Sequence, residues 1–233
     1  MSGTLFGIGV GPGDPDLITL KAHKILQAVP VIAYPAPEQG DSLARRIAAP
    51  HIPDGRREIV IRIPLDMTQS PDRSSYDRAA DDIAAVLRGG EDVAIICEGD
   101  PFFYGSFMYL FDRLGADVPV QVVPGISSLM ACASAALMPL VARDETLFVL
   151  PATMAEADLR ARLEMAEAAA IIKLGRHAAK VIKILGDLDL LAAARYISHA
   201  TLPDQRICPL SDVAPDDVPY FAMILVRKTG VGS

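Results

Sequence analysis

The segment Gly7-Ile8-Gly9-Val10-Gly11-Pro12-Gly13-Asp14-Pro15 indicates the fold of the N-terminal half of this chain. It continues an apolar run that starts at Thr4, and this run predicts a buried strand. The glycines and prolines that follow predict a tight loop. Apolar residues at helical spacing continue up to Pro30, and a second strand is predicted over Val31–Tyr34, before Pro35. A strand, a loop, a helix and a strand in this order are typical of a parallel α/β sheet.

The same loop is similar to the dinucleotide-binding fingerprint GxGxxG but does not satisfy it. A fingerprint that starts at Gly7 requires glycine where Pro12 stands, and one that starts at Gly9 requires glycine where Asp14 stands. We therefore do not expect a nicotinamide cofactor. A loop with few side chains can bring its backbone close to another molecule, or it can serve only as a turn, and the residues alone leave both open.

A second loop follows a strand predicted over Asp92–Cys97. Its sequence is Glu98-Gly99-Asp100-Pro101-Phe102-Phe103-Tyr104-Gly105, and a helix is predicted over Phe102–Leu114. Open α/β sheets bind their ligands at the carboxyl ends of the strands. Asp100 could accept hydrogen bonds from a ligand, or it could cap the helix that follows. These two interpretations are equally open.

A third loop, Val123-Pro124-Gly125-Ile126-Ser127-Ser128, follows a strand predicted over Val120–Val123 and precedes a helix predicted over Ser127–Leu137. Ser127 is either a helix N-cap or a ligand contact. Each of the three loops follows a strand, and parallel strands end at a common sheet edge. The repetition favours one binding site over three separate helix caps.

Length and composition limit the class of protein. The chain has 233 residues, which suits two domains of about 100–130 residues, and we expect them to cover residues 1–120 and 121–233. Hydrophobic residues make up 51% and charged residues 22%, which predicts packed cores. The net charge of −7 argues against a nucleic-acid partner. Three widely spaced cysteines predict buried thiols and no metal site; they are Cys97, Cys132 and Cys208.

No apolar run reaches the roughly 20 residues that a membrane-spanning helix needs, so we expect no membrane segment. The N-terminus lacks a basic stretch followed by an apolar core, which favours a cytoplasmic protein. The second half is predicted to be α/β as well. Its predicted helices are Asp158–Ala168 and Ala178–Leu185, and its predicted strands are Leu147–Leu150, Ala170–Leu174, Arg195–Ile197, Ile207–Leu210 and Tyr220–Val226.

Positive charge is concentrated in one short segment of this acidic chain. The segment contains Arg45, Arg46, Arg56, Arg57 and Arg62 against only Asp54 and Glu58. Such a cluster could hold an anionic ligand, although the charges alone favour a solvated helix face and loop.

Taken together, the three loops resemble the motifs of the tetrapyrrole methylase family. The resemblance is carried by Gly9-x-Gly11-Pro12-Gly13-Asp14-Pro15, Gly99-Asp100-Pro101 with Tyr104-Gly105, Val123–Ser128 and Pro139-Leu140. These motifs stand in the family's order and spacing over nearly the whole chain. The resemblance implies two α/β domains of the tetrapyrrole methylase type, an active site in the cleft between them, a homodimer, and S-adenosylmethionine as methyl donor, with S-adenosylhomocysteine as product.

The resemblance also implies ligand contacts, position by position. The cofactor contacts would be Glu98, Gly99, Asp100, Phe103, Ser127, Ser128, Leu174, Ala200 and Thr201. Leu174 stands where relatives often have methionine, and Ala200 where they often have glycine. The tetrapyrrole would lie against Gly11, Pro12 and Tyr104, and its carboxylates would be held by Arg45 and Arg46.

The stretch Phe103–Leu110 is similar to the branch of the family that methylates C20 of precorrin-2 or of cobalt-factor II, whereas Tyr34-Pro35 departs from the Tyr-Asp of uroporphyrinogen-III methyltransferases. The implied reaction converts precorrin-2 to precorrin-3A in cobalamin biosynthesis. Asp41 or a bound water could remove the proton displaced from C20. The alternatives are a cobalt-factor II C20-methyltransferase, a ribosomal-RNA ribose methyltransferase, a diphthine synthase and a non-catalytic S-adenosylmethionine-binding protein.

Overall fold

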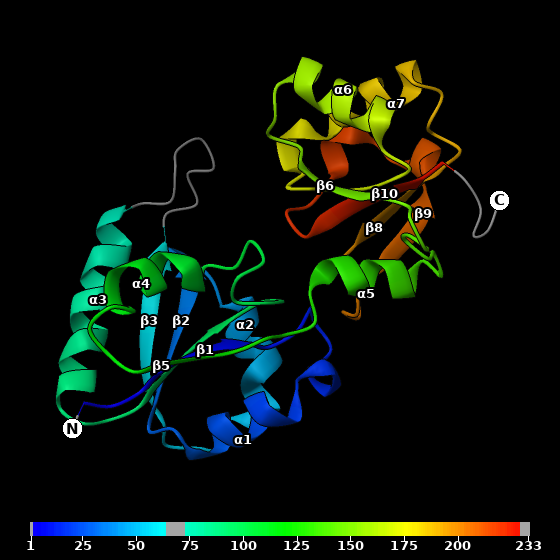
Figure 1. The fold of residues 1–233 in the computed structure, drawn as a ribbon. Helices are drawn as coiled ribbons and strands as arrows, with labels where there is room; N and C mark the ends of the chain where they lie inside the picture. The colour runs from blue at the N-terminus through cyan, green and yellow to red at the C-terminus, as the bar shows by residue number, and fades with distance from the viewer. Residues whose placement is uncertain (1, 64–72, 229–233) are drawn as a thin grey trace. The chain divides into compact units, whose positions relative to one another are not determined.

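The computed structural model describes residues 2–63 and 73–228. The chain divides into two units, Met1–Ser127 and Ser128–Ser233, and each contains one five-stranded sheet with helices (Figure 1). The predicted α/β class is therefore confirmed. The boundary expected at residue 120 falls at the start of β5 (Val120–Val123), which pairs with β1 (Leu5–Gly9) in the first sheet. The first unit accordingly continues beyond this strand.

All strand pairs in the sheet of the first unit are parallel, and their order is β3-β2-β4-β1-β5. The remaining strands are β2 (Val31–Pro37), β3 (Arg57–Ile63) and β4 (Val93–Cys97). The helices of this unit are α1 (Leu20–Ala28), α2 (Leu43–Ala48), α3 (Arg73–Arg88) and α4 (Phe107–Leu114), with short 3-10 turns η1 (Pro15–Leu17) and η2 (Ala49–His51).

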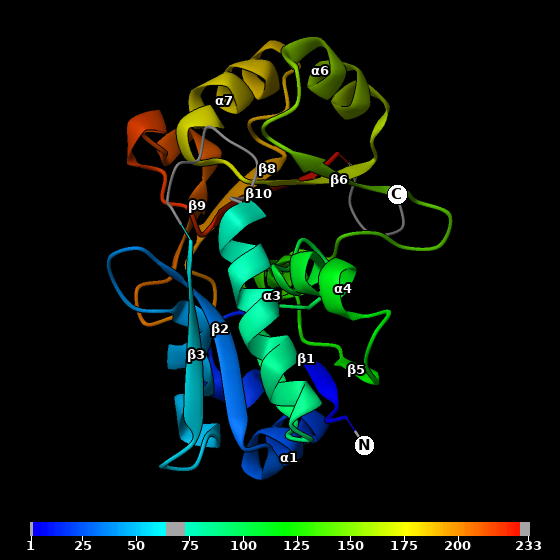
Figure 2. The same cartoon turned by 90° about the vertical axis from the view of Figure 1, so that its left-hand side faces the viewer.

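Two apolar cores enclose this sheet, one on each face. Side chains of α3 and α4, such as Ile83 and Phe107, pack with Ile95 on one face, and Figure 2 shows both helices over it. Side chains of α1 and α2, such as Leu26, pack with Ile96 on the other face. β4 is buried at every residue because its neighbours cover both sides. Packing on both faces therefore keeps the ends of the central strands in fixed positions.

The sheet of the second unit has the order β6-β7-β10-β8-β9 and is mixed. Its strands are β6 (Leu147–Pro151), β7 (Ala168–Ile172), β8 (Ala194–Ser198), β9 (Arg206–Pro209) and β10 (Ala222–Arg227). Its helices are α5 (Ser128–Ala135), α6 (Glu156–Met165) and α7 (Ala178–Asp187), with 3-10 turns η3 (Gly175–His177), η4 (Leu210–Asp212) and η5 (Pro215–Asp217). α5 packs on one face, and α6 and α7 pack on the other.

Several element boundaries differ from the sequence prediction by a few residues. The helix predicted over Phe102–Leu114 begins only at Phe107, because Tyr104 adopts φ 57°, which a helix excludes. The helix predicted over Asp158–Ala168 ends at Met165, since Ala166 is extended and β7 follows. β7 starts and ends earlier than predicted, so that Leu174 lies outside the strand.

β2 continues through Pro35 and Pro37, although Pro35 was expected to end it. β4 pairs with β2 only at Val31–Ala33, whereas β3 stays paired through Pro37. Among the described residues, one side of β2 has no strand partner beyond Ala33, and a proline, which has no N–H to donate, is tolerated at such a position. Within the described ranges, no helix combines the length and apolar character needed to cross a membrane.

Candidate functional site

Three loops of the first unit meet at one edge of its sheet. β1 lies between β4 and β5 and is parallel to both, with Gly9 opposite Cys97, so the chain leaves all three strands at the same edge. Just beyond this edge, Gly99 N donates a hydrogen bond to Gly11 O (2.8 Å), and Gly11 N donates one to Gly99 O (3.4 Å). The first and second loops are therefore joined by their backbones.

Glycine is required where these loops touch. A Cβ atom on Gly9 would lie 2.5 Å from Gly99 O and 2.6 Å from Gly125 N, well inside the van der Waals limit. A Cβ on Gly125 would collide with Gly99 O as well. The backbones of the three loops thus approach one another directly, which only residues without a side chain allow.

The carboxylate of Asp100 joins the second loop to the third. Its Oδ1 accepts a hydrogen bond from Phe102 N (2.9 Å), and its Oδ2 accepts one from Gly125 N (3.1 Å). The bond to Phe102 N closes a turn, and α4 starts only later, at Phe107. Each carboxylate oxygen retains capacity for another hydrogen bond, so this structural role is compatible with a ligand contact.

An aromatic segment follows Asp100 and is unusually exposed for its residue types. Relative exposure is 47% for Phe102, 38% for Phe103 and 46% for Tyr104. Phe103 and Tyr104 touch edge to face, with ring centroids 5.2 Å apart. Tyr104 has a left-handed backbone conformation, which few residues other than glycine adopt, and this conformation sets the direction of the segment. Flat rings in such a position can contact a planar ligand.

Arg45 on α2 is held by Glu58 on β3. Nε and Nη2 of Arg45 both donate to Glu58 Oε1, at 3.0 and 2.9 Å, and Tyr34 Oη donates to Glu58 Oε2. The bond to Arg45 lowers the pKa of Glu58. Burial, followed by the bond to Glu58, raises the pKa of Tyr34 to about 12. Tyr34 and Arg45 are also hydrogen-bonded, so all three side chains belong to one network.

The other arginines of the basic segment are mostly occupied within the unit. Arg56 donates to Gln27 O, Arg57 pairs with Glu91, and Arg62 donates to Pro37 O and Gly40 O. Arg46 is exposed, and within residues 2–63 and 73–228 its guanidinium makes no hydrogen bond or ion pair. Of the five arginines in the basic segment, Arg46 and, in part, Arg45 thus remain available to a ligand.

Glu98 is the first residue after β4, and it is half-buried. Ala94 and Ile96 pack on the α1 and α2 side of the sheet, and alternation along the strand places Glu98 on that side too. Its Oε1 accepts a hydrogen bond from Ala44 N in the first turn of α2 (3.1 Å). Burial raises the pKa of this carboxyl group.

The remaining candidates of the first unit lie around the same loops. Gly11 is buried and Pro12 is half-buried in the first loop. Asp41 is exposed and precedes Ser42, whose hydroxyl caps α2 by accepting from Arg45 N (3.2 Å). In the described part of the chain the Asp41 carboxylate has no hydrogen-bond or ion-pair partner.

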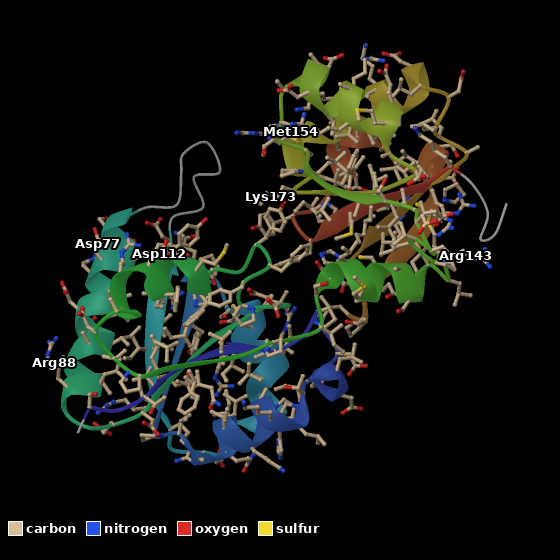
Figure 3. All side chains as sticks on the ribbon, in the orientation of Figure 1. Asp77, Arg88, Asp112, Arg143, Met154 and Lys173 are labelled. Carbon is tan, nitrogen blue, oxygen red and sulfur yellow. The ribbon has the colours of Figure 1, made fainter. Side chains whose placement is uncertain are left out.

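In the second unit, three strands end at one edge. β6 is parallel to β7, and β10 is antiparallel to both β7 and β8, so β6, β7 and β8 run in one direction. Non-glycine residues with positive φ follow two of these ends: Lys173 (57°) after β7, and His199 (49°) and Thr201 (68°) after β8. Figure 3 labels Lys173. A strained backbone is often found at functional sites, and here the strained residues adjoin Leu174 and Ala200.

Leu174 and Ala200 have little side-chain surface to offer. Leu174 is fully buried in the core beneath α6 and α7, and Ala200 is buried against the α5 side of the sheet. A ligand would meet these two residues through their backbone. Thr201 N is already bound to Gln205 Oε1 (2.8 Å). Ser127 is half-buried and Ser128 is exposed at the start of α5.

Sequence reasoning missed a polar pocket in the second unit. His199 Nδ1 lies 3.0 Å from Asp204 Oδ2. These two residues line an open pocket of about 410 Å³ together with Tyr196, Ser198, Arg206, Asp216, Asp217, Val218 and Pro219. The pocket depends on the pairing of β8 with β9, which no local sequence pattern signals. Among the described residues, no group of three or more His, Cys, Asp or Glu could hold a metal ion.

Comparison with known proteins gives the same family as the loops. The model of the Tetrapyrrole (Corrin/Porphyrin) Methylases matches residues 4–214. A Precorrin-2 C(20)-methyltransferase of Sinorhizobium sp is 38% identical over 232 residues, which covers 96% of this chain and 95% of the relative. A Cobalt-precorrin-2 C(20)-methyltransferase of Salmonella typhimurium is 30% identical over 231 residues and covers 98% of both chains.

The Cobalamin biosynthesis protein CobIJ of Mycobacterium bovis is 39% identical over 232 residues, which covers 96% of this chain but 46% of the relative. The chain thus spans about half the length of that relative and nearly all of the other two. The loops that suggested the resemblance, Gly9–Pro15, Gly99–Gly105 and Val123–Ser128, all lie within the matched residues. The resemblance is confirmed: this chain belongs to the tetrapyrrole (corrin/porphyrin) methylase family.

Proposed function

We propose that this protein transfers a methyl group from S-adenosylmethionine to C20 of precorrin-2 and so forms precorrin-3A in cobalamin biosynthesis. One observation carries the proposal above all. The relative named Precorrin-2 C(20)-methyltransferase aligns along 95% of its own length at 38% identity. Membership of the methylase family supports the reaction type.

The polar groups of the candidate site suit S-adenosylmethionine. Carboxylates of Glu98 and Asp100 can accept from an ammonium or ribose hydroxyl group, and hydroxyls of Ser127 and Thr201 add further donors and acceptors. In addition, Ser106 Oγ is buried without a partner in the described part of the chain, and a ligand or a water would satisfy it. When bound, S-adenosylmethionine supplies a methyl group on a positively charged sulfur.

The work of the protein in such a reaction is mainly to position its ligands. Methyl transfer is an in-line displacement that needs no covalent nucleophile, and correct orientation can contribute about 7–11 kcal/mol. The glycine contacts between the three loops make a stiff support for this purpose. Leu174 and Ala200, which are buried, would contribute fixed backbone groups from the second unit.

We assign the tetrapyrrole to residues around the first loop and α2. Gly11 and Pro12 would border the macrocycle, and the exposed ring of Tyr104 would contact its plane. Precorrin-2 bears several carboxylates, which suit the guanidinium groups of Arg45 and Arg46, and that of Arg46 has no partner among the described residues. Glu58 would keep Arg45 in position, because two of its nitrogens are bound there.

A cobalt-containing substrate is the second candidate. The relative from Salmonella typhimurium is named for cobalt-precorrin-2 and aligns over 98% of this chain, at the lower identity of 30%. We therefore propose precorrin-2 first and cobalt-factor II second. We also propose that the enzyme is a cytoplasmic homodimer that does not bind nucleic acid; light scattering should give about twice the chain mass of 24.8 kDa.

The deciding experiment is an anaerobic incubation of the purified protein with S-adenosylmethionine and either precorrin-2 or cobalt-factor II, followed by mass spectrometry of the pigment. We expect precorrin-2 to gain one methyl group. Turnover of cobalt-factor II alone would transfer the assignment to that substrate. Cofactor binding without methylation of either pigment would refute both and would favour the RNA, diphthine or non-catalytic alternatives.

A further inference from the structure

Methylation of a ring carbon that carries hydrogen leaves one proton to be removed. The bond from the methyl carbon to sulfur breaks and its electrons stay on sulfur, while π electrons at C20 form the new carbon–carbon bond. The C20–H bond must then break, and its electrons restore the conjugation of the macrocycle. A group on the protein that accepts this proton would accelerate the step, typically by about 10²–10⁴-fold.

Glu98 stands where such a group is needed if the proposed function holds. It directly follows the central strand β4, at the edge where the three loops meet. Its side chain lies on the α2 side of the sheet, which is also the side that carries Arg45 and Arg46. The carboxyl group is therefore on the side of the unit to which we assign the tetrapyrrole.

Backbone groups orient the carboxylate of Glu98. Oε1 accepts a hydrogen bond from Ala44 N, which fixes the direction of the carboxylate without adding a charge. The backbone N–H of Glu98 itself also hydrogen-bonds the carboxylate. Within residues 2–63 and 73–228, no side chain donates to either oxygen, and neither is among the buried polar atoms left without a partner. The backbone thus anchors the group, and lone pairs remain that can accept a proton.

We propose that Glu98 is the general base of the reaction: its carboxylate accepts the proton from C20, and the proton then passes to solvent. This inference rests on the proposed function. It assigns a chemical role to a side chain that the resemblance places only among the cofactor contacts. Asp41 is the competing candidate, but nothing anchors its exposed carboxylate.

The surroundings of Glu98 make its carboxylate a stronger base than one in water. Burial raises the pKa of Glu98, and the hydrogen bonds from its own backbone N–H and from Ala44 N offset only part of this effect. Arg45 is neutralised by Glu58 rather than by Glu98. The ionisable groups on adjoining elements are Asp14 in the first loop, Tyr34 on β2, Asp41, Arg45 and Arg46 around α2, Cys97 on β4 and Asp100 in the second loop.

The test compares wild-type enzyme with Glu98→Gln, using precorrin-2 with hydrogen or deuterium at C20. Glutamine keeps an oxygen that can accept from Ala44 N, so α2 stays anchored, but it cannot take up the proton. We expect kcat to fall about 100-fold and the deuterium isotope effect on kcat to increase. The dissociation constant of S-adenosylmethionine should change less than about threefold, because the amide oxygen of glutamine can still accept a hydrogen bond from an ammonium or hydroxyl group of the cofactor. The matched control is Glu164→Gln on the exposed face of α6, which should behave as wild type.

The pH profile gives a second readout. A base must be ionised, so wild-type kcat should fall as the pH drops through the raised pKa of Glu98, and this acid limb should vanish in Glu98→Gln. The proposal is overturned if Glu98→Gln keeps both the wild-type kcat and the acid limb of the pH profile. It is also overturned if Asp41→Asn, rather than Glu98→Gln, loses them. If Glu98→Gln turns over more slowly and binds the cofactor more weakly, but shows the wild-type isotope effect, Glu98 is a binding residue and not the base. Failure of the proposed function is seen separately, as absence of methylation by the wild type.

Discussion

Gly9→Ala should separate the three loops of the candidate site. The added Cβ would lie 2.5 Å from Gly99 O, whereas ordinary contacts start at 3.4 Å, so the first and second loops must move apart by about 0.9 Å. Extra carbon in a closely packed region costs about 1–3 kcal/mol of unfolding free energy. A displacement of about 1 Å in a catalytic site can cost about 100-fold in rate.

Urea unfolding and isothermal titration with S-adenosylmethionine measure the two effects. Gly186→Ala in α7 is the matched control, since its Cβ would meet nothing closer than Leu191 Cδ1 at 3.7 Å. The same chemical change there should leave stability equal or raise it by about 0.5–1 kcal/mol. We expect Gly9→Ala to lose stability and at least about tenfold in cofactor affinity. If Gly9→Ala matches Gly186→Ala in both assays, the close approach of the loops does not support the site.

Three further predictions concern charged side chains. Glu58→Gln should lower the free energy of unfolding by about 0.5–1 kcal/mol at pH 7, a small effect because the pair with Arg45 is partly exposed. Since the pKa of Glu58 is lowered in the folded state, this contribution is present at neutral pH and is lost as the pH falls below about 4.3. Arg46→Ala should raise the KM for precorrin-2 about tenfold through a lost charged hydrogen bond, with unchanged cofactor affinity. Arg227→Met should lower the free energy of unfolding by about 3 kcal/mol, because Arg227 is buried and donates to both carboxylate oxygens of Glu145.

Each of these predictions has an outcome that contradicts it. For Glu58, urea unfolding at pH 7 and pH 3.5 should give a smaller difference from wild type at the lower pH, and an equal difference would be inconsistent with the ion pair. For Arg46, a KM within twofold of wild type would remove it from the substrate site. For Arg227, the double variant with Glu145→Gln should cost less than the sum of the single changes; additive costs would mean that the pair is not coupled.

Local sequence patterns predicted the elements well where each pattern acts over a few residues. The strands β1, β4 and β5 lie close to where the apolar runs and the glycines and prolines that follow them placed them. The errors arise where a distant contact overrides the local pattern. Phe102–Leu114 has apolar residues at helical spacing, but the bonds of Asp100 to Phe102 N and Gly125 N hold its first part as a loop.

The partners of the charged residues could not be read from the sequence. Arg45 and Glu58 belong to different elements, and their meeting depends on β2 pairing with β3 in a register that sets Tyr34 beside Val60. The same register sets Arg62 opposite Ala36, next to Pro37, whose carbonyl oxygen accepts a hydrogen bond from Arg62. Such pairings depend on contacts between segments far apart in the chain, and composition alone carries no information about them.

The sequence by itself determined the family, the α/β class and the three loops, because glycine and proline restrict the backbone locally and their order along the chain is specific. Only the tertiary structure decided which side chains remain available for chemistry. It joined Gly11 to Gly99, bound most of the arginines of the basic segment within the unit, and anchored the carboxylate of Glu98 through Ala44 N. These outcomes depend on strand order and register, since a side chain's partners are set by whichever elements the fold packs around it.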